Sequence, residues 1–160
     1  MSNNFPAVQD EKGATMSCAC CNTTTKKTRM SCPVCGQNCF PVSSQTILHQ
    51  VQFPENQAIA EGDYAFCANS ECNIGYFSPS NTIPKACLRA FQPDQEAMLC
   101  HCFDISESIY RMALDDGTAE TMKAFIVQQT KAGLCACESR NPSGRCCLAN
   151  FSQMEQEHTN

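Results

Sequence analysis

The chain has 160 residues, a net charge of −5 and 15 cysteines but no tryptophan. Leu, Ile, Val and Phe together make up about 17% of it, below the roughly 20% at which a packed apolar core becomes doubtful. The net charge is too small for disorder through self-repulsion, so we expect bound metal to supply the missing stability. Only 11 Lys and Arg residues and a pI of about 5.1 argue against nucleic acid as a partner.

The beginning of the chain lacks the features of a secretory signal. Residues 1–17 contain neither an apolar h-region nor a basic n-region, and no stretch approaches the ~18 consecutive apolar residues of a membrane helix. We therefore expect a cytoplasmic protein, not inserted in a membrane, whose thiols stay reduced and bind metal. A disulfide framework is the alternative if the chain is secreted.

A zinc-knuckle signature follows a polar N-terminal segment. Residues 1–17 are predicted to be a disordered tail, and residues 18–92 a zinc-binding lobe. The motif Cys32-Pro33-Val34-Cys35-Gly36 predicts a turn that points two thiolates at one metal, with the glycine allowing a positive φ. Upstream, Cys20 and Cys21 are alternative zinc ligands. Together with Cys18 they are also candidate Cu(I) ligands, because Cu(I) prefers soft thiolates.

A second pair of cysteines completes the predicted zinc site. A strand is expected around Val42 to Val51, and residues 63–67 and 72–78 are expected to be strands that enter and leave a turn, with a further short strand from Thr82 to Cys87. Cys67 and Cys72 lie on either side of this turn. The pattern predicts a zinc-ribbon-like β lobe with tetrahedral zinc, whose four ligands are Cys32, Cys35, Cys67 and Cys72. Cys39 and Cys87 have no evident partners, which is typical of buried small side chains.

Residues 93–157 are predicted to form a helical lobe, which makes the fold class α+β. Asp104 and Glu107 form a capping-box-like pair for a first helix. The residues expected on the inner face of that helix are Ile105, Ile109, Met112 and Ala113. Thr118 opens a second helix, and a final helix is expected to turn Leu148, Phe151 and Met154 inward.

Six cysteines of this lobe come as three pairs from three loops. They are Cys100 and Cys102, Cys135 and Cys137, and the adjacent Cys146 and Cys147. Four thiolates brought to one point are what a small iron–sulfur cluster needs. The pattern therefore predicts that four of the six bind such a cluster, and the alternative is a second zinc site. Adjacent cysteines seldom both bind one iron, so one of Cys146 and Cys147 is expected as a ligand.

Two known families resemble these motifs. The first resemblance is to bacterioferritin-associated ferredoxins and the related 2Fe–2S segment of NifU-type proteins. It covers residues 99–103, the helical hairpin that follows and residues 133–138. Those proteins place a C-x-C motif one helical hairpin ahead of a C-x-x-C motif. Here the second half is instead C-x-C, followed by residues 141–147. That departure, together with the knuckle motif and residues 66–77, resembles the N-terminal portion of CopZ-type copper chaperones over roughly residues 18–152. The resemblance implies a zinc site and a 2Fe–2S cluster.

The resemblance also implies cluster ligands and a function. By the ferredoxin spacing, Cys100 and Cys102 are the first two ligands, and Cys135 is the third, with Cys137 as the alternative. The implied activity is electron transfer that reduces Cu(II) to Cu(I), with copper ions and an electron donor of unknown identity as partners. In the family a heavy-metal-associated domain with an M-x-C-x-x-C loop follows, which is missing here. We therefore expect copper delivery to need a separate copper chaperone domain or a copper transporter.

Two other functional classes fit the same residues. One is a zinc-organised interaction module without redox chemistry, and the other is a ferredoxin that serves a partner other than copper. The sequence has no Ser/His/Asp arrangement, phosphate loop or Rossmann fingerprint. Whether the protein is an enzyme stays open: we expect an electron-transfer or metallochaperone-like protein, for which the resemblance implies cupric reductase activity.

Overall fold

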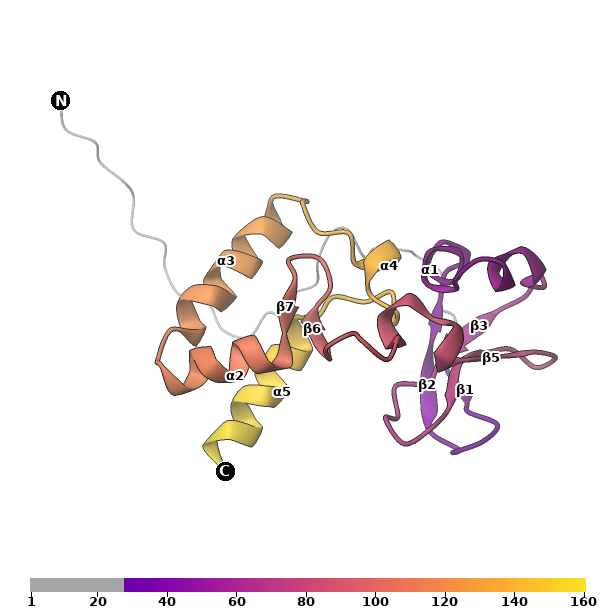
Figure 1. The fold of residues 1–160 in the computed structure, drawn as a ribbon, viewed down its shortest axis with the longest axis horizontal. Helices are drawn as coiled ribbons and strands as arrows, with labels where there is room; N and C mark the ends of the chain where they lie inside the picture. Colours follow the sequence, from indigo (N-terminus) through magenta and orange to yellow (C-terminus); the bar gives the residue numbers. More distant parts are fainter. Residues whose placement is uncertain (1–27) are drawn as a thin grey trace.

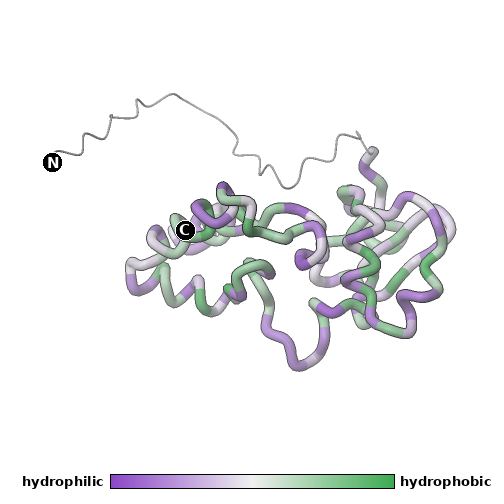
Figure 2. Tube along the Cα trace, turned by 90° about the horizontal axis from the view of Figure 1, so that it is seen from above, coloured by the Kyte–Doolittle hydropathy of each residue, from purple (hydrophilic) through white to green (hydrophobic). Residues whose placement is uncertain are grey.

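Two lobes follow one another along the chain (Figure 1). The structure is a computed structural model that describes residues 28–160. The predicted tail, residues 1–17, and the three cysteines Cys18, Cys20 and Cys21 lie outside this range. Figure 2 shows the same two lobes from above, with hydrophobic stretches along both of them.

The first lobe is built on a five-stranded antiparallel sheet with the strands in sequence order. The strands are β1 (Met30–Ser31), β2 (Asn38–Val42), β3 (Tyr64–Phe66), β4 (Ile74–Phe77) and β5 (Thr82–Pro84). The lobe also contains helix α1 (Ser44–Gln50) and the 3-10 turns η2 (Glu55–Ala58), η3 (Lys85–Cys87) and η4 (Arg89–Phe91). Its apolar core joins the sheet to α1 through Val42, Ile47, Tyr76 and Leu88.

The strand predicted around Val42 to Val51 is wrong, because most of this segment forms α1. The strand ends at Val42, and Ser43 caps the helix by accepting a hydrogen bond at 3.2 Å from the Thr46 N–H. The buried residues Thr46, Ile47 and Gln50 then recur at helical spacing. The two strands expected before Cys67 and after Cys72 are confirmed, because β3 ends at Phe66 and β4 begins at Ile74.

The second lobe consists of a short hairpin and four helices. The hairpin pairs β6 (Met98–Cys100) with β7 (Ile105–Ser106). The helices are α2 (Glu107–Asp115), α3 (Ala119–Lys131), α4 (Cys137–Arg140) and α5 (Leu148–Thr159). Tyr110 of α2 packs edge-on against Phe151 of α5, with ring centroids 4.6 Å apart, and both side chains are fully buried. As predicted, Met154 is buried too and Leu148 packs against this core.

The N-cap of the first helix of this lobe lies two positions after the predicted one. Ser106, not Asp104, is the N-cap and accepts a hydrogen bond from the Ile109 N–H at 3.2 Å, whereas Asp104 has a φ of 58° in the hairpin turn. Ile109 and Met112, predicted to face inward, are 43% and 63% exposed. Ala113 is buried as predicted, and so is Ile105, while Tyr110 takes the inward position expected for Ile109.

The lobes meet where α1 packs against α4 (Figure 1). The short helix α4 begins at Cys137, one of the predicted cluster cysteines. This contact therefore connects the sheet lobe to the second group of thiols. None of the helices between residues 28 and 160 is long and apolar enough to cross a membrane.

Candidate metal centres

The four cysteines predicted to bind zinc come together at one end of the sheet. The sulfur atoms of Cys32, Cys35, Cys67 and Cys72 all lie within 4.8 Å of one another. Two of the sulfur–sulfur distances are 3.8 Å, for Cys32 and Cys72, and 3.6 Å, for Cys35 and Cys67. Tetrahedral zinc with Zn–S bonds of ~2.3 Å separates its sulfurs by about 3.8 Å. The donor set and its spacing therefore fit one zinc ion.

Two turns aim these thiols at a common point. In the first, the Gly36 N–H donates to the Cys32 carbonyl at 2.9 Å, and Gly36 has the predicted positive φ, 73°. In the second, the Cys72 N–H donates to the Asn69 carbonyl at 3.1 Å, and the Asn69 side chain accepts from the Glu71 N–H at 3.0 Å. Both turns are local hydrogen-bonded structures, and they hold the two pairs of thiols at the same end of the sheet.

The pKa values of the thiols in and beside this tetrad depend on how deeply each thiol is buried. Cys35 is the exposed member, and hydrogen bonding from the Gln37 backbone lowers the pKa of its thiol to about 6. Burial instead raises the pKa of Cys67. Cys39 is a fifth, buried thiol that packs against the tetrad and donates to the Gln37 carbonyl at 3.2 Å. Burial raises the pKa of Cys39 as well, so it stays protonated beside the predicted ligands.

Five of the six C-terminal thiols form a closed ring in the second lobe. Each thiol interacts with the next in the order Cys100, Cys102, Cys137, Cys146, Cys147 and back to Cys100. The Cys102 and Cys137 sulfurs are 3.5 Å apart. The ring draws on the β6–β7 hairpin, the start of α4 and the start of α5, so three separate loops meet here as predicted.

The ring thiols strongly perturb one another. Hydrogen bonds from Cys102 and Cys147 lower the pKa of Cys100 to about 3, and those from Cys137 and Cys147 lower the pKa of Cys146 to about 2. The same interactions raise the pKa of Cys137 and of Cys147. Thiols this close cannot all ionise by themselves, because their charges repel. A positively charged centre would allow several to become thiolates together.

The sixth cysteine, Cys135, lies at the side of the ring. It packs with Cys137, Cys102, Phe103 and Cys146. The sequence favoured Cys135 over Cys137 as the third ligand, whereas the structure places Cys137 next to Cys102 within the ring. Between residues 28 and 160, only the first tetrad brings three or more ligand atoms all within 4.8 Å of one another. The C-terminal ring is therefore more spread out than the tetrad.

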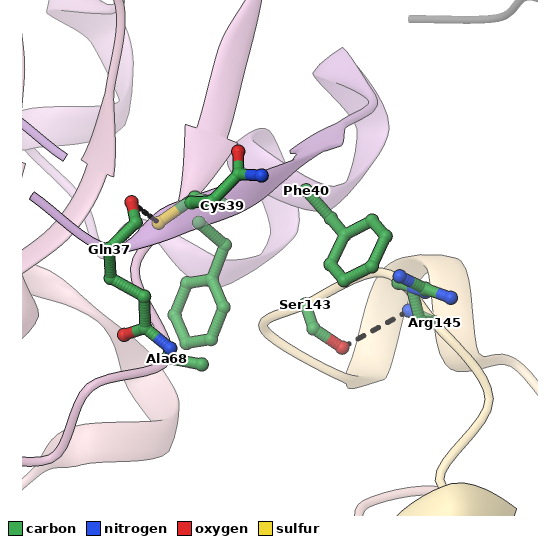
Figure 3. Close-up of a pocket in the computed structure, with 8 residues that line it drawn as sticks. Gln37, Cys39, Phe40, Ala68, Ser143 and Arg145 are labelled. Atoms are coloured by element: carbon green, nitrogen blue, oxygen red, sulfur yellow. Dashed lines mark hydrogen bonds between the residues drawn. The ribbon is translucent and has the colours of Figure 1, made fainter. Parts of the chain in front are cut away.

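A pocket of about 120 Å³ opens between the lobes (Figure 3). On one side lie Gln37, Cys39 and Phe40, and on the other Ser143 and Arg145 of the loop that precedes Cys146. The guanidinium groups of Arg29 and Arg145 each lie 3.7 Å from the centroid of the Phe40 ring. Sequence analysis missed these residues, because no motif connects Phe40 with a loop more than a hundred residues away.

Comparison with known proteins finds a likeness for the first lobe. Residues 29–89 match the family model zf_CopZ, a zinc binding domain. This part of the chain is therefore similar to CopZ-type zinc-binding domains. The structure is similar to the X-ray structure of the Archaeoglobus fulgidus CopZ N-terminal domain, with 26% sequence identity and a TM-score of 0.63, over 78% of this chain and 97% of that one. The likeness extends past residue 89, because residues 29–89 make up less than half of the chain. No match was found among curated proteins.

Proposed function

We propose that this chain is a zinc- and 2Fe–2S-binding redox protein of copper handling, which passes one electron to Cu(II) and binds the resulting Cu(I). The observation that carries the proposal is the presence of two separate thiol groups of different shape. One is a compact tetrad that fits a single tetrahedral ion, and the other is a wider ring that suits a two-iron centre. The likeness to the CopZ N-terminal domain supports copper as the substrate.

The tetrad has a structural role in this proposal. Cys32, Cys35, Cys67 and Cys72 hold zinc and tie β1, β2, β3 and β4 together at one end of the sheet. A structural zinc site contributes about 10–16 kcal/mol of apparent binding energy to folding. Such a contribution is needed here, because the core of this lobe is small and several of its buried residues are the cysteines themselves.

The ring has the redox role. Cys100, Cys102, Cys137 and one of Cys146 and Cys147 hold the cluster, which when bound accepts one electron and passes it on. Cys100 and Cys147 are buried against the helical core, whereas Cys102 and Cys146 are only partly buried. Cys102 and Cys146, which lie on either side of Cys137 in the ring, are therefore the thiols that a small ion or a redox partner can approach.

The copper step balances as a one-electron transfer. The protein receives one electron from an external one-electron reductant of low potential and gives it to Cu(II), which becomes Cu(I). Fully cysteine-ligated clusters can lie near −400 mV, as in plant-type ferredoxins, so the transfer to Cu(II) is downhill. Cu(I) then binds soft thiolates, for which Cys18, Cys20, Cys21 and the ring cysteine not used by the cluster are the candidates. A cytoplasmic location suits this chemistry, because the thiols must stay reduced.

Stopped-flow mixing tests the copper step directly. Protein reduced with dithionite and then desalted is mixed with Cu(II), and the visible absorbance of the cluster is followed. We expect reoxidation of the cluster in step with formation of Cu(I). Free thiols also reduce Cu(II), so a cluster-free Cys102→Ser variant serves as the control for that slower route. A cluster that stays reduced while Cu(I) forms at the control rate would contradict the proposal and leave a ferredoxin for another partner.

A further inference from the structure

The loop between the two halves of the ring, residues 138–145, is held by the zinc-binding domain. It connects Cys137 to Cys146, so its position determines where both thiols lie. At one end, the buried side chain of Gln50 donates through Nε2 to the Ser139 carbonyl at 3.1 Å and to the Arg140 carbonyl at 2.8 Å. A side chain of α1 thereby satisfies the last carbonyls of α4, which would otherwise lack partners at the helix end.

The middle of the loop is fixed by a buried tyrosine. The Tyr76 hydroxyl, on β4, donates to the Pro142 carbonyl at 2.6 Å, and Tyr76 is fully buried. Two residues further along, Gly144 lies so close to α1 that a Cβ on it would be 2.7 Å from Thr46 Oγ1. Beyond that, Arg145 stacks on Phe40 of β2. Four successive points of the loop are thus held by three elements of the other lobe.

The loop is also rigid in itself. Asn141 is buried, and its Nδ2 donates to the Arg145 carbonyl at 2.9 Å while its Oδ1 accepts from the Ser143 N–H at 2.9 Å and from the Ser143 hydroxyl at 2.8 Å. A stiff loop transmits the position of its anchors to its ends. Its ends are Cys137 and Cys146, two neighbours in the thiol ring.

We propose that Tyr76 and Gln50 are positioning residues for the second metal centre, and that the zinc-binding domain thereby determines how tightly the ring retains its cluster. This inference rests on the proposed function. It goes beyond it by assigning the zinc-binding domain a role in the second centre, in addition to its own folding. The helical lobe supplies Cys100 and Cys102 from its own hairpin, whereas Cys137 and Cys146 depend on contacts made by the other lobe.

The test compares two conservative tyrosine variants of the full chain carrying both metals. Tyr76→Phe removes the hydrogen bond to the loop. Tyr64→Phe is the matched control, because Tyr64 is also a buried tyrosine of the same sheet, but its hydroxyl accepts from Asn81 Nδ2 at 3.3 Å within the zinc-binding domain. Bleaching of the cluster by an iron chelator, the zinc content and the electron paramagnetic resonance spectrum of the reduced protein are measured for each.

We expect Tyr76→Phe to lose iron about tenfold faster than the parent protein, which corresponds to about 1.4 kcal/mol, with a shifted resonance spectrum and full zinc content. Tyr64→Phe should lose iron at the parent rate with an unchanged spectrum. Gln50→Met removes the two hydrogen bonds to the start of the same loop and should behave like Tyr76→Phe. Equal rates for Tyr76→Phe and Tyr64→Phe in iron-loaded protein would overturn the inference while leaving the proposed function intact. A parent protein without iron would refute the proposed function itself.

Discussion

Replacing Gly144 by alanine should strain the contact between the two lobes. Gly144 has a φ of +65°, which costs an alanine about 1–2 kcal/mol. Its new Cβ would also lie 2.7 Å from Thr46 Oγ1, closer than real Cβ contacts allow. Thr46 is fully buried and hydrogen-bonded to Ser43 at 3.0 Å, so it cannot move aside. Overpacking of this kind costs about 1–3 kcal/mol, and the total expected loss is therefore about 2–5 kcal/mol.

The assay is urea unfolding of the metal-loaded protein, with a control that separates the two costs. Gly133 has a similar φ of +73°, but nothing lies within 4 Å of the Cβ it would gain. Gly133→Ala should therefore lose only the backbone part, about 1–2 kcal/mol.

A double-mutant cycle isolates the clash. Thr46→Ala removes the atom that the new Cβ meets, so Gly144→Ala should cost less in the Thr46→Ala background than in the parent protein. If Gly144→Ala is no more destabilising than Gly133→Ala, or shows no coupling to Thr46→Ala, the packing of the loop against α1 is not as described.

Three further predictions concern the metal centres and the helical core. Cys67→Ser should give protein that lacks zinc and is cleaved rapidly by protease in the first lobe, whereas Cys87→Ser, at a half-buried cysteine outside both thiol groups, should keep its zinc and its resistance. Cys102→Ser should bleach or strongly shift the visible spectrum of the cluster while zinc is retained, and an unchanged spectrum would remove this residue from the ligand set. Glu155 bonds Lys123 at 2.8 Å, which with its other hydrogen bond lowers the pKa of this carboxyl. Glu155→Gln should therefore cost up to about 1 kcal/mol at pH 7. That difference should disappear as the pH falls through the lowered pKa, and a loss that persists at low pH would contradict it.

The zinc site could be predicted from the sequence because its information is local. The knuckle motif fixes the relation between Cys32 and Cys35 within five residues, and a turn fixes that between Cys67 and Cys72. The positive φ of Gly36 is a direct consequence of that geometry. The antiparallel sheet indicated by the strand pattern is then enough to bring the first pair of cysteines next to the second.

The segment from Val42 to Val51 favours a strand because of its apolar and β-branched residues, whereas in the structure the capping Ser43 starts helix α1 directly after Val42. Similarly, the capping-box spacing favours Asp104 as the cap of α2, whereas Ser106 has the cap role. The apolar spacing favours Ile109 for the inner face, whereas its neighbour Tyr110 is buried. Adjacent residues lie about 100° apart around a helix, so a face assigned from apolar side chains alone can be wrong by one position.

The choice between Cys135 and Cys137, and the contacts between the lobes, could not be read from the sequence. Gln50 and Tyr76 meet the loop across 66 to 90 positions of chain. No periodicity or motif encodes such a pairing, because it depends on how the completed lobes pack.

Metal analysis of anaerobically purified protein, together with its visible spectrum, tests the central claim most directly. The two thiol groups predict one zinc and two irons per chain, and a red-brown protein whose visible absorbance falls when one electron per chain is added. Colourless protein without iron, after expression with adequate iron, would contradict the account, and about two zincs per chain in it would indicate that the C-terminal cysteines hold a second zinc instead.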